Sequence, residues 1–251
     1  FRLIQKRAQE YGSPLIGIPD RGPLDRSVVR NMLAICKHYN VKIWHGHDYK
    51  SNALGLMLRP FWNMKLVTTV HGWVKHTSRT PLYYAIDRWC LPMYHHVICV
   101  SEDLEERMEN MGMSKDRYSL VRNAIDEQMF QRQYPPAGSP MRVEGQVPAG
   151  RMVVGAMGRL SPEKGFGDLI RAAHKLISDG VDMELWIAGE GNAHEELQNL
   201  IDHLGCGDRV KLLGFCADTI AFYHALDVFV LSSLREGLPN VVLEAMAMRV
   251  P

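Results

Sequence analysis

The sequence lacks any uncharged apolar run that approaches the roughly 20 residues needed for a membrane helix. It also has no low-complexity tract, no fixed-period repeat and no collagen-like or coiled-coil bias. Membrane-spanning and fibrous proteins are therefore excluded as interpretations of these residues. What remains is a chain of 251 residues, 46% hydrophobic and 23% charged, which is typical of a soluble protein with one large or two modest domains.

Three chemical signatures are missing as well. The five cysteines are odd in number and form no Cys-x-x-Cys pair, so we expect buried thiols in a reducing compartment rather than a disulfide framework or a zinc site. There is no Gly-x-Gly-x-x-Gly, which argues against a dinucleotide oxidoreductase. There is no Asp-x-Asp, and His45, His47 and Asp48 alone are weak grounds for a metal site, so we expect no metal and no cofactor.

Both ends of the chain fall inside predicted elements of secondary structure. The chain starts at Phe1 inside a helical pattern and stops at Pro251 where a strand begins, so we expect an internal fragment and leave open an upstream signal or anchor.

Residues 1–145 carry 20 basic and 14 acidic side chains (+6), and residues 146–251 carry 9 and 14 (−5). We interpret the basic half as solvated surface; contact with an anionic membrane or an acidic acceptor is the alternative.

Short apolar strands alternate with amphipathic helices along the whole chain. Strands are predicted at 15–18, 41–44, 66–70, 97–100, 120–122, 153–157, 185–188, 210–213 and 228–231. Helices are predicted at 24–39, 168–178, from 193, near 219–226 and from 239. This alternation predicts an α/β protein with parallel sheets and right-handed crossovers.

A stretch at 133–150, rich in Pro and Gly and without periodicity, is predicted to be a linker. It separates an N-terminal Rossmann-like domain (1–132) from a C-terminal one (151–251), both incomplete at the chain ends. Two such domains predict a cleft, with ligands bound beyond the carboxyl ends of the strands.

The strongest chemical signal is the segment 232–247. Pro239 suits the first turn of a helix, whose free N–H groups and dipole favour an anion. Glu244 is surrounded by apolar residues, so its carboxylate needs a partner. That partner is either a cation in a structural ion pair or the hydroxyl groups of a bound sugar. Because Glu236 lies at the same corner, we favour the bound sugar.

Weaker signals lie at other predicted strand ends. Gly158 and Arg159, with Lys164 five residues on, could clamp a diphosphate. Gly189 and Gly191 would let a ligand approach the backbone. His71 is either a packed neutral histidine or a hydrogen-bond donor to a sugar.

Together these segments resemble family 4 of the retaining glycosyltransferases, which has the GT-B fold. The similarity rests on Gly158-Arg159-Leu160 with Glu163-Lys164-Gly165, Gly189-Glu190-Gly191, Leu213-Gly214, and Glu236 through Glu244 with seven residues between the two glutamates. In the first half, His45-x-His47-Asp48, His71-Gly72, Val100-Ser101-Glu102 and Asn123-Ala124-Ile125-Asp126 agree, so the similarity covers nearly the whole chain.

The resemblance implies a role for each matching residue. Arg159 and Lys164 would clamp the diphosphate, Glu244 would hold the ribose, and Glu236 and His71 would contact the donor sugar. The other expected nucleotide-sugar contacts are Gly158, Gly189, Gly214, Phe215 beside the base, and the backbone of Gly237, Leu238, Pro239 and Asn240.

The implied reaction is transfer of a sugar from a nucleoside diphosphate to an acceptor hydroxyl, with retention and without a metal. The acceptor is expected to be lipid-linked, a saccharide or a small molecule, and no nucleic acid is expected. We also expect a cytoplasmic location, with contact at the inner membrane surface as an option. An epimerase or phosphorylase of the same fold and a non-catalytic binding module are the alternatives. Arg249, where the family usually has Gly, would crowd its turn if φ is positive.

Overall fold

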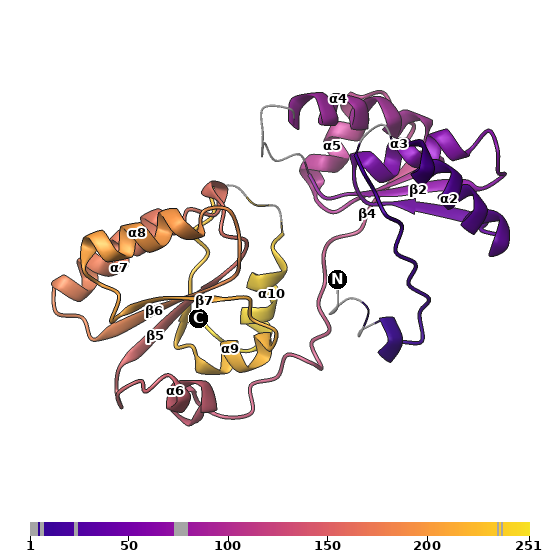
Figure 1. Cartoon of the computed structure of the whole chain (residues 1–251). Coiled ribbons are helices and arrows are strands. Elements are labelled where there is room, and N and C mark those ends of the chain that lie inside the picture. The colour runs from indigo at the N-terminus through magenta and orange to yellow at the C-terminus, as the bar shows by residue number, and fades with distance from the viewer. Residues whose placement is uncertain (1–4, 6–7, 23–24, 73–79, 235, 237) are drawn as a thin grey trace. The chain divides into compact units, whose positions relative to one another are not determined.

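The computed structural model describes all residues except 1–4, 6–7, 23–24, 73–79, 235 and 237 (Figure 1). The chain forms two compact units, Phe1–Arg122 and Asn123–Pro251. Each unit contains a four-stranded sheet in which every pairing is parallel. The predicted class, two Rossmann-like parallel-sheet α/β domains, is confirmed; the cleft stays a prediction.

The first unit places its strands in chain order, β1-β2-β3-β4. The strands are β1 (Ile43–Gly46), β2 (Lys65–Val70), β3 (His96–Cys99) and β4 (Tyr118–Leu120). The helices are α2 (Arg26–His38), α3 (Tyr49–Leu58), α4 (Thr80–Cys90), α5 (Glu102–Asn110) and the short 3₁₀ turns η1 (Leu91–Met93) and η2 (Lys115–Arg117). Because all strands run the same way, their carboxyl ends meet at one edge.

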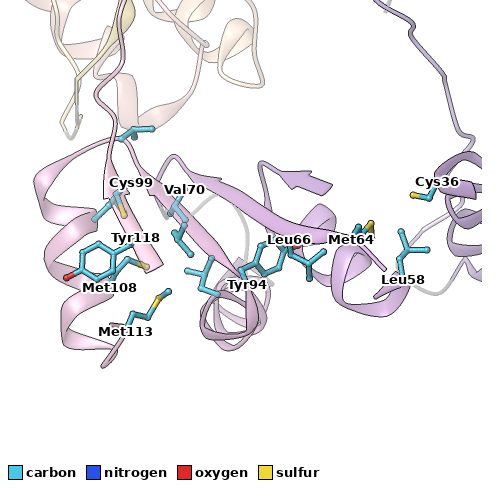
Figure 2. Close-up of a cluster of buried hydrophobic side chains, with 14 residues drawn as sticks. Cys36, Leu58, Met64, Leu66, Val70, Tyr94, Cys99, Met108, Met113 and Tyr118 are labelled. Atoms are coloured by element: carbon cyan, nitrogen blue, oxygen red, sulfur yellow. The ribbon is translucent and has the colours of Figure 1, made fainter. Parts of the chain in front are cut away.

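The core of the first unit is one buried cluster that follows the sheet from end to end (Figure 2). Leu66 of β2, Val97 of β3 and Tyr94, which follows η1, have no exposed surface. Met108 of α5 packs into the same cluster as Leu58 of α3. Helix α3 begins at a capping box, in which Asp48 and Ser51 bond each other's backbone N–H groups, so the loop after β1 has a defined end.

The second unit has strand order β7-β6-β5-β8. Its strands are β5 (Met152–Met157), β6 (Met183–Ala188), β7 (Val210–Gly214) and β8 (Val228–Phe229). Its helices are η3 (Pro136–Gly138), α6 (Pro140–Glu144), η4 (Pro162–Lys164), α7 (Phe166–Ser178), α8 (His194–Leu204), α9 (Thr219–Ala225) and α10 (Asn240–Ala247).

Helices cover both faces of this second sheet. Strand β6 is buried at all six positions, and its side chains alternate between two clusters. Leu185 and Ile187 join the cluster with α7 and α8, whereas Trp186 and Ala188 join the one with α9 and α10. Figure 1 shows the same arrangement, with α7 and α8 on one side and α9 and α10 on the other.

The segment 133–150, which the sequence predicts to be a linker, has contacts with the second unit. The chain divides after Arg122 rather than after residue 132, and the segment that follows packs on the second unit. Arg142 is 8% exposed; its Nε donates to the Ala225 carbonyl at 2.7 Å and its guanidinium pairs with Asp227. Arg132 donates to the Leu226 carbonyl at 2.6 Å. These arginine anchors give the segment fixed partners despite its Pro- and Gly-rich composition.

The strand predictions in the first unit differ from the structure in detail, and the strand predicted at 41–44 is β1, which lies two residues later at Ile43–Gly46. Residues 15–18 form no strand, and Leu15 and Ile16 are 42% and 45% exposed. Pro14 and Pro19 flank this run, and a proline lacks the N–H that a sheet ladder needs. The strand predicted at 120–122 is β4, which starts two residues earlier at Tyr118. Among the described residues, no helix is both long and apolar enough to cross a bilayer.

Candidate active site

The strand order of the second unit creates a switch point beside β5. The chain moves from β5 to β6 and β7 on one side, then crosses to β8 on the other. The loops after β5 and β8 therefore leave the sheet in different directions, and ligands bind α/β sheets at such a point. Residues 158–165 and 230–239, which carry most of the predicted site residues, follow these two strands.

Backbone and side-chain hydrogen bonds tie the two loops together. The Ser232 hydroxyl donates to the Lys164 carbonyl at 2.8 Å, and the Leu234 N–H donates to the Glu163 carbonyl at 2.9 Å. Gly165 has φ +65°, and a Cβ there would collide with the Ser232 carbonyl oxygen. The approach of the loops thus depends on glycine at position 165.

This approach brings together two predicted site residues. The Lys164 ammonium pairs with the Glu236 carboxylate, although 72 positions separate them in sequence. Their side chains are 23% and 21% exposed, so the pair is partly shielded from water. Arg159, the other predicted cation, is exposed after β5. The corner therefore offers cationic groups at a strand-to-helix turn, an arrangement suited to a diphosphate.

The glycines at neighbouring strand ends are needed for close backbone contact. Gly189 after β6 has φ +143°, and a Cβ there would overlap the Gly158 carbonyl oxygen. The Gly189 N–H donates to the Gly214 carbonyl at 2.7 Å, and Gly214 ends β7 with φ +69°. Phe215 follows and is 59% exposed, so an aromatic ring is accessible next to Gly214, which has no side chain.

The partner of Glu244 is a tyrosine rather than a cation. The Tyr223 hydroxyl of α9 lies 2.9 Å from Glu244 Oε2 and 3.0 Å from the Val241 carbonyl oxygen. Burial, with Glu244 nearby, raises the pKa of Tyr223 far above its ordinary value, so this hydroxyl stays protonated and donates. Tyr223 orients the carboxylate without neutralising it, and nothing in the sequence pattern of α9 had singled it out.

We expect Tyr223→Phe to weaken nucleotide binding about 3–10-fold and to lower the free energy of unfolding by about 1–2 kcal/mol, because a hydrogen bond to a charged group is lost. Isothermal titration calorimetry at a temperature well below the melting temperature measures the affinity of the folded protein, so it separates the two effects. Phe222→Leu, a change at a buried neighbour whose side chain has no hydrogen-bonding group for Glu244, is the control for stability. Unchanged affinity in Tyr223→Phe would refute the orienting role.

The remaining residues of this corner are positioned by the backbone. Pro239 precedes α10 with an extended ψ of 128°, and Asn240 is the first helical residue. Asn123 donates from its side-chain amide to the Leu238 carbonyl at 3.0 Å, so a residue from the start of the second unit supports the predicted sugar loop. Gly237 lies outside the described residues. Arg249 does have positive φ, +52°, the strained geometry anticipated for a non-glycine residue.

In the first unit, three histidines gather where β1 and β2 end. His71 is exposed, and its Nε2 lies 3.3 Å from His47 Nδ1. His45 Nε2 lies 2.8 Å from the Thr69 hydroxyl. Desolvation, and then the neighbouring His47, lowers the pKa of His71, so the neutral ring is the main form at pH 7. In the part of the chain that the structure describes, no group of three or more His, Cys, Asp or Glu side chains could hold a metal.

Comparison with known sequences covers both units. Residues 3–129 match the family described as Glycosyltransferase Family 4, and residues 151–251 match Glycosyl transferases group 1. The chain is 34% identical over 148 residues to the lipopolysaccharide core biosynthesis glycosyltransferase LpsD of Rhizobium meliloti, covering 59% of this chain and 40% of that protein. It is 27% identical over 226 residues to D-inositol 3-phosphate glycosyltransferase of Corynebacterium glutamicum, covering 82% and 54%. The chain thus spans about half the length of the curated relatives it matches.

Solved structures show the same fold. Anabaena Alr3699/HepE, crystallised with UDP and glucose, matches 99% of this chain and 69% of its own at a TM-score of 0.83 and 23% identity. Sucrose-phosphate synthase from Thermosynechococcus elongatus matches 95% and 62% at a TM-score of 0.75 and 22% identity. One family match takes in half of this chain, and the second covers residues 151–251, which include Lys164, Glu236 and Glu244. The chain therefore belongs to Glycosyltransferase Family 4 and, with it, to the group 1 glycosyltransferases.

Proposed function

We propose that the protein transfers a sugar from a nucleoside diphosphate sugar to an acceptor hydroxyl. The observation that carries the proposal is the corner at the switch point, where Lys164 and Glu236 pair and Glu244 follows eight residues later. A cation, two carboxylates and a helix start at one strand edge suit a ligand that has a diphosphate and two sets of hydroxyl groups. The relatives' names support this reaction class over an epimerase, a phosphorylase or a non-catalytic module.

In this proposal, Lys164 and Arg159 stabilise the leaving diphosphate. Breaking the bond between the sugar C1 and the phosphate oxygen separates charge, and fixed cations lower the energy of that state. Without a donor, Glu236 neutralises Lys164; when the diphosphate binds, Lys164 turns to the phosphate and Glu236 accepts from a sugar hydroxyl. The first-turn N–H groups of α10 add partial positive charge at the same place.

Glu244 recognises the ribose. Tyr223 bonds Oε2, so the other oxygen of the carboxylate can accept from ribose hydroxyl groups. The exposed ring of Phe215, next to Gly214, offers a stacking surface to the base. The backbone at Gly158 and Gly189 lies at the strand ends where the phosphates bind, and His71, as a neutral ring, donates to the donor sugar.

Retention and metal independence are part of the same proposal. With no carboxylate nucleophile assigned, the acceptor attacks the face that the leaving group vacates, and the leaving phosphate takes the proton. The cations Lys164 and Arg159 then do the work that a divalent metal does in other transferases. Proton NMR of the product's anomeric signal and turnover in excess EDTA test these two points.

The acceptor is proposed to be a saccharide or a lipid-linked saccharide, since lipopolysaccharide core enzymes are among the relatives. A cytoplasmic location and a peripheral membrane contact remain predictions of the sequence.

The first test is thermal stabilisation of the purified chain by UDP, GDP, ADP and CMP. A ligand at about 100 times its dissociation constant adds roughly 2.7 kcal/mol of apparent stability. We expect one nucleotide to raise the melting temperature of the wild type and of Glu196→Ala, an exposed change on α8, but not of Glu244→Ala. Equal stabilisation of all three proteins, or of none, would contradict the assignment of Glu244.

A further inference from the structure

A pocket of about 330 Å³ opens in the first unit, at the amino ends of the strands, whereas His71 lies at their carboxyl ends. It is lined by residues 59–65, which run from the end of α3 to the start of β2, and by His95, which directly precedes β3. Lys65 starts β2 and His71 follows its end, so the pocket and the histidine cluster are separated by a strand of about 20 Å. This is the amino edge of the sheet, away from the strand ends where substrates bind α/β folds.

The hydrogen-bonding state of His95 is determined by the backbone. The Leu66 N–H donates to His95 Nδ1 at 2.9 Å. The neutral ring must then carry its proton on Nε2, which makes the other nitrogen a donor. Its position in the pocket wall is also defined, because the next residue, His96, is paired in the sheet with Val67.

The other polar lining residues are donors too. Arg59 uses one guanidinium N–H on the Met93 carbonyl at 3.2 Å, which anchors a group that has five N–H donors. Lys65 contributes an ammonium and Asn63 an amide. None of the residues that line the pocket is acidic.

The charged groups around the pocket also favour a bound anion. Burial first, and then Lys65, Arg59 and Arg117, lowers the pKa of His95. Arg117 is held nearby by the Pro92 carbonyl at 2.8 Å. Three cations thus act on one imidazole. An anion in the pocket would relieve this repulsion.

We propose that this pocket binds the phosphate group of a phosphorylated ligand. Arginine, lysine and a histidine N–H are the donors that recognise a phosphate, and its volume lies at the lower end of the range of about 300–1,000 Å³ for ligand sites. Phe61, 64% exposed in the wall, offers apolar surface to the organic part of the ligand. The site is separate from the proposed sugar-transfer chemistry and would make the first unit responsive to a second ligand.

The test is NMR titration of His95 in the whole chain with inorganic phosphate, at constant ionic strength. Bound phosphate should raise the pKa of His95 by about 0.5–1 unit, because a nearby anion favours the charged ring. Arg59→Met/Lys65→Met should bind phosphate at least tenfold more weakly. Lys65→Met alone, at an exposed position, should show a smaller loss and serves if the double variant does not fold.

Two controls separate this site from other effects. Lys42→Met removes a cation at the same edge whose side chain bonds Asn40 and does not line the pocket, and it should bind phosphate like the wild type. Glu244→Ala should do the same, so failure of the sugar-transfer proposal leaves this result intact. No response of His95, or equal losses in Lys42→Met and Lys65→Met, would overturn the proposal.

The source of the phosphate is decided by two further probes. Glycerol 3-phosphate stands for a soluble ligand, and phosphatidylcholine vesicles with added phosphatidic acid stand for a lipid headgroup. Binding of either probe that is lost in Arg59→Met/Lys65→Met supports the site and names its source. Binding of neither, or binding that the double substitution leaves unchanged, overturns it.

Discussion

Lys164→Met is expected to lower kcat/KM for sugar transfer by about 10²–10³-fold, the usual effect of removing one group that stabilises developing negative charge. Methionine keeps the length of the side chain and removes the charge. Initial rates with the nucleotide sugar identified by thermal stabilisation give the value. Lys175→Met, an exposed change in the last turn of α7, should retain wild-type rates.

The pairing of Lys164 with Glu236 requires a second comparison. If Lys164 only supports Glu236, then Lys164→Met/Glu236→Gln will be no slower than Glu236→Gln. If Lys164 acts on the diphosphate, the double variant will be slower than either single one, because two separate interactions with the donor are lost. The first result, in a protein that remains folded, would remove Lys164 from the reaction.

Gly189→Ala is expected to destabilise the second unit by more than about 3 kcal/mol, because strain from positive φ adds to a steric overlap. The new Cβ would overlap the Gly158 carbonyl oxygen, so β5 and β6 could not keep their separation at the site. Urea unfolding measured by tryptophan fluorescence reports this loss, since Trp186 is buried in β6.

Gly180→Ala is the matched control for this substitution. Gly180 also has positive φ, +91°, but a Cβ there meets nothing within 4 Å. Gly180→Ala should lower the free energy of unfolding by about 1–2 kcal/mol, because it adds backbone strain alone. Equal costs at the two positions would show that the contact between Gly189 and Gly158 does not limit stability.

The α/β class, and the positions of the candidate site residues at strand ends, followed from local patterns. Apolar strands that alternate with single helices can only form parallel sheets with crossovers, and parallel strands bring their carboxyl ends to one edge. Lys164, Gly189 and Glu236 could therefore be assigned to that edge from their positions after strands. The interpretation of 133–150 as a linker came from composition, which cannot detect anchors such as Arg142 on Ala225 and Asp227.

Which residues stand at strand ends could be worked out before the fold was known, because a period of two or 3.6 is a property of neighbouring positions. The contacts of those residues could not, because they join parts of the chain that are distant in sequence. The ion pair of Lys164 with Glu236 spans 72 positions, and the bond of Tyr223 to Glu244 joins two helices that meet over one sheet face. Such partners depend on how loops and helices pack in three dimensions, and no local periodicity records that information.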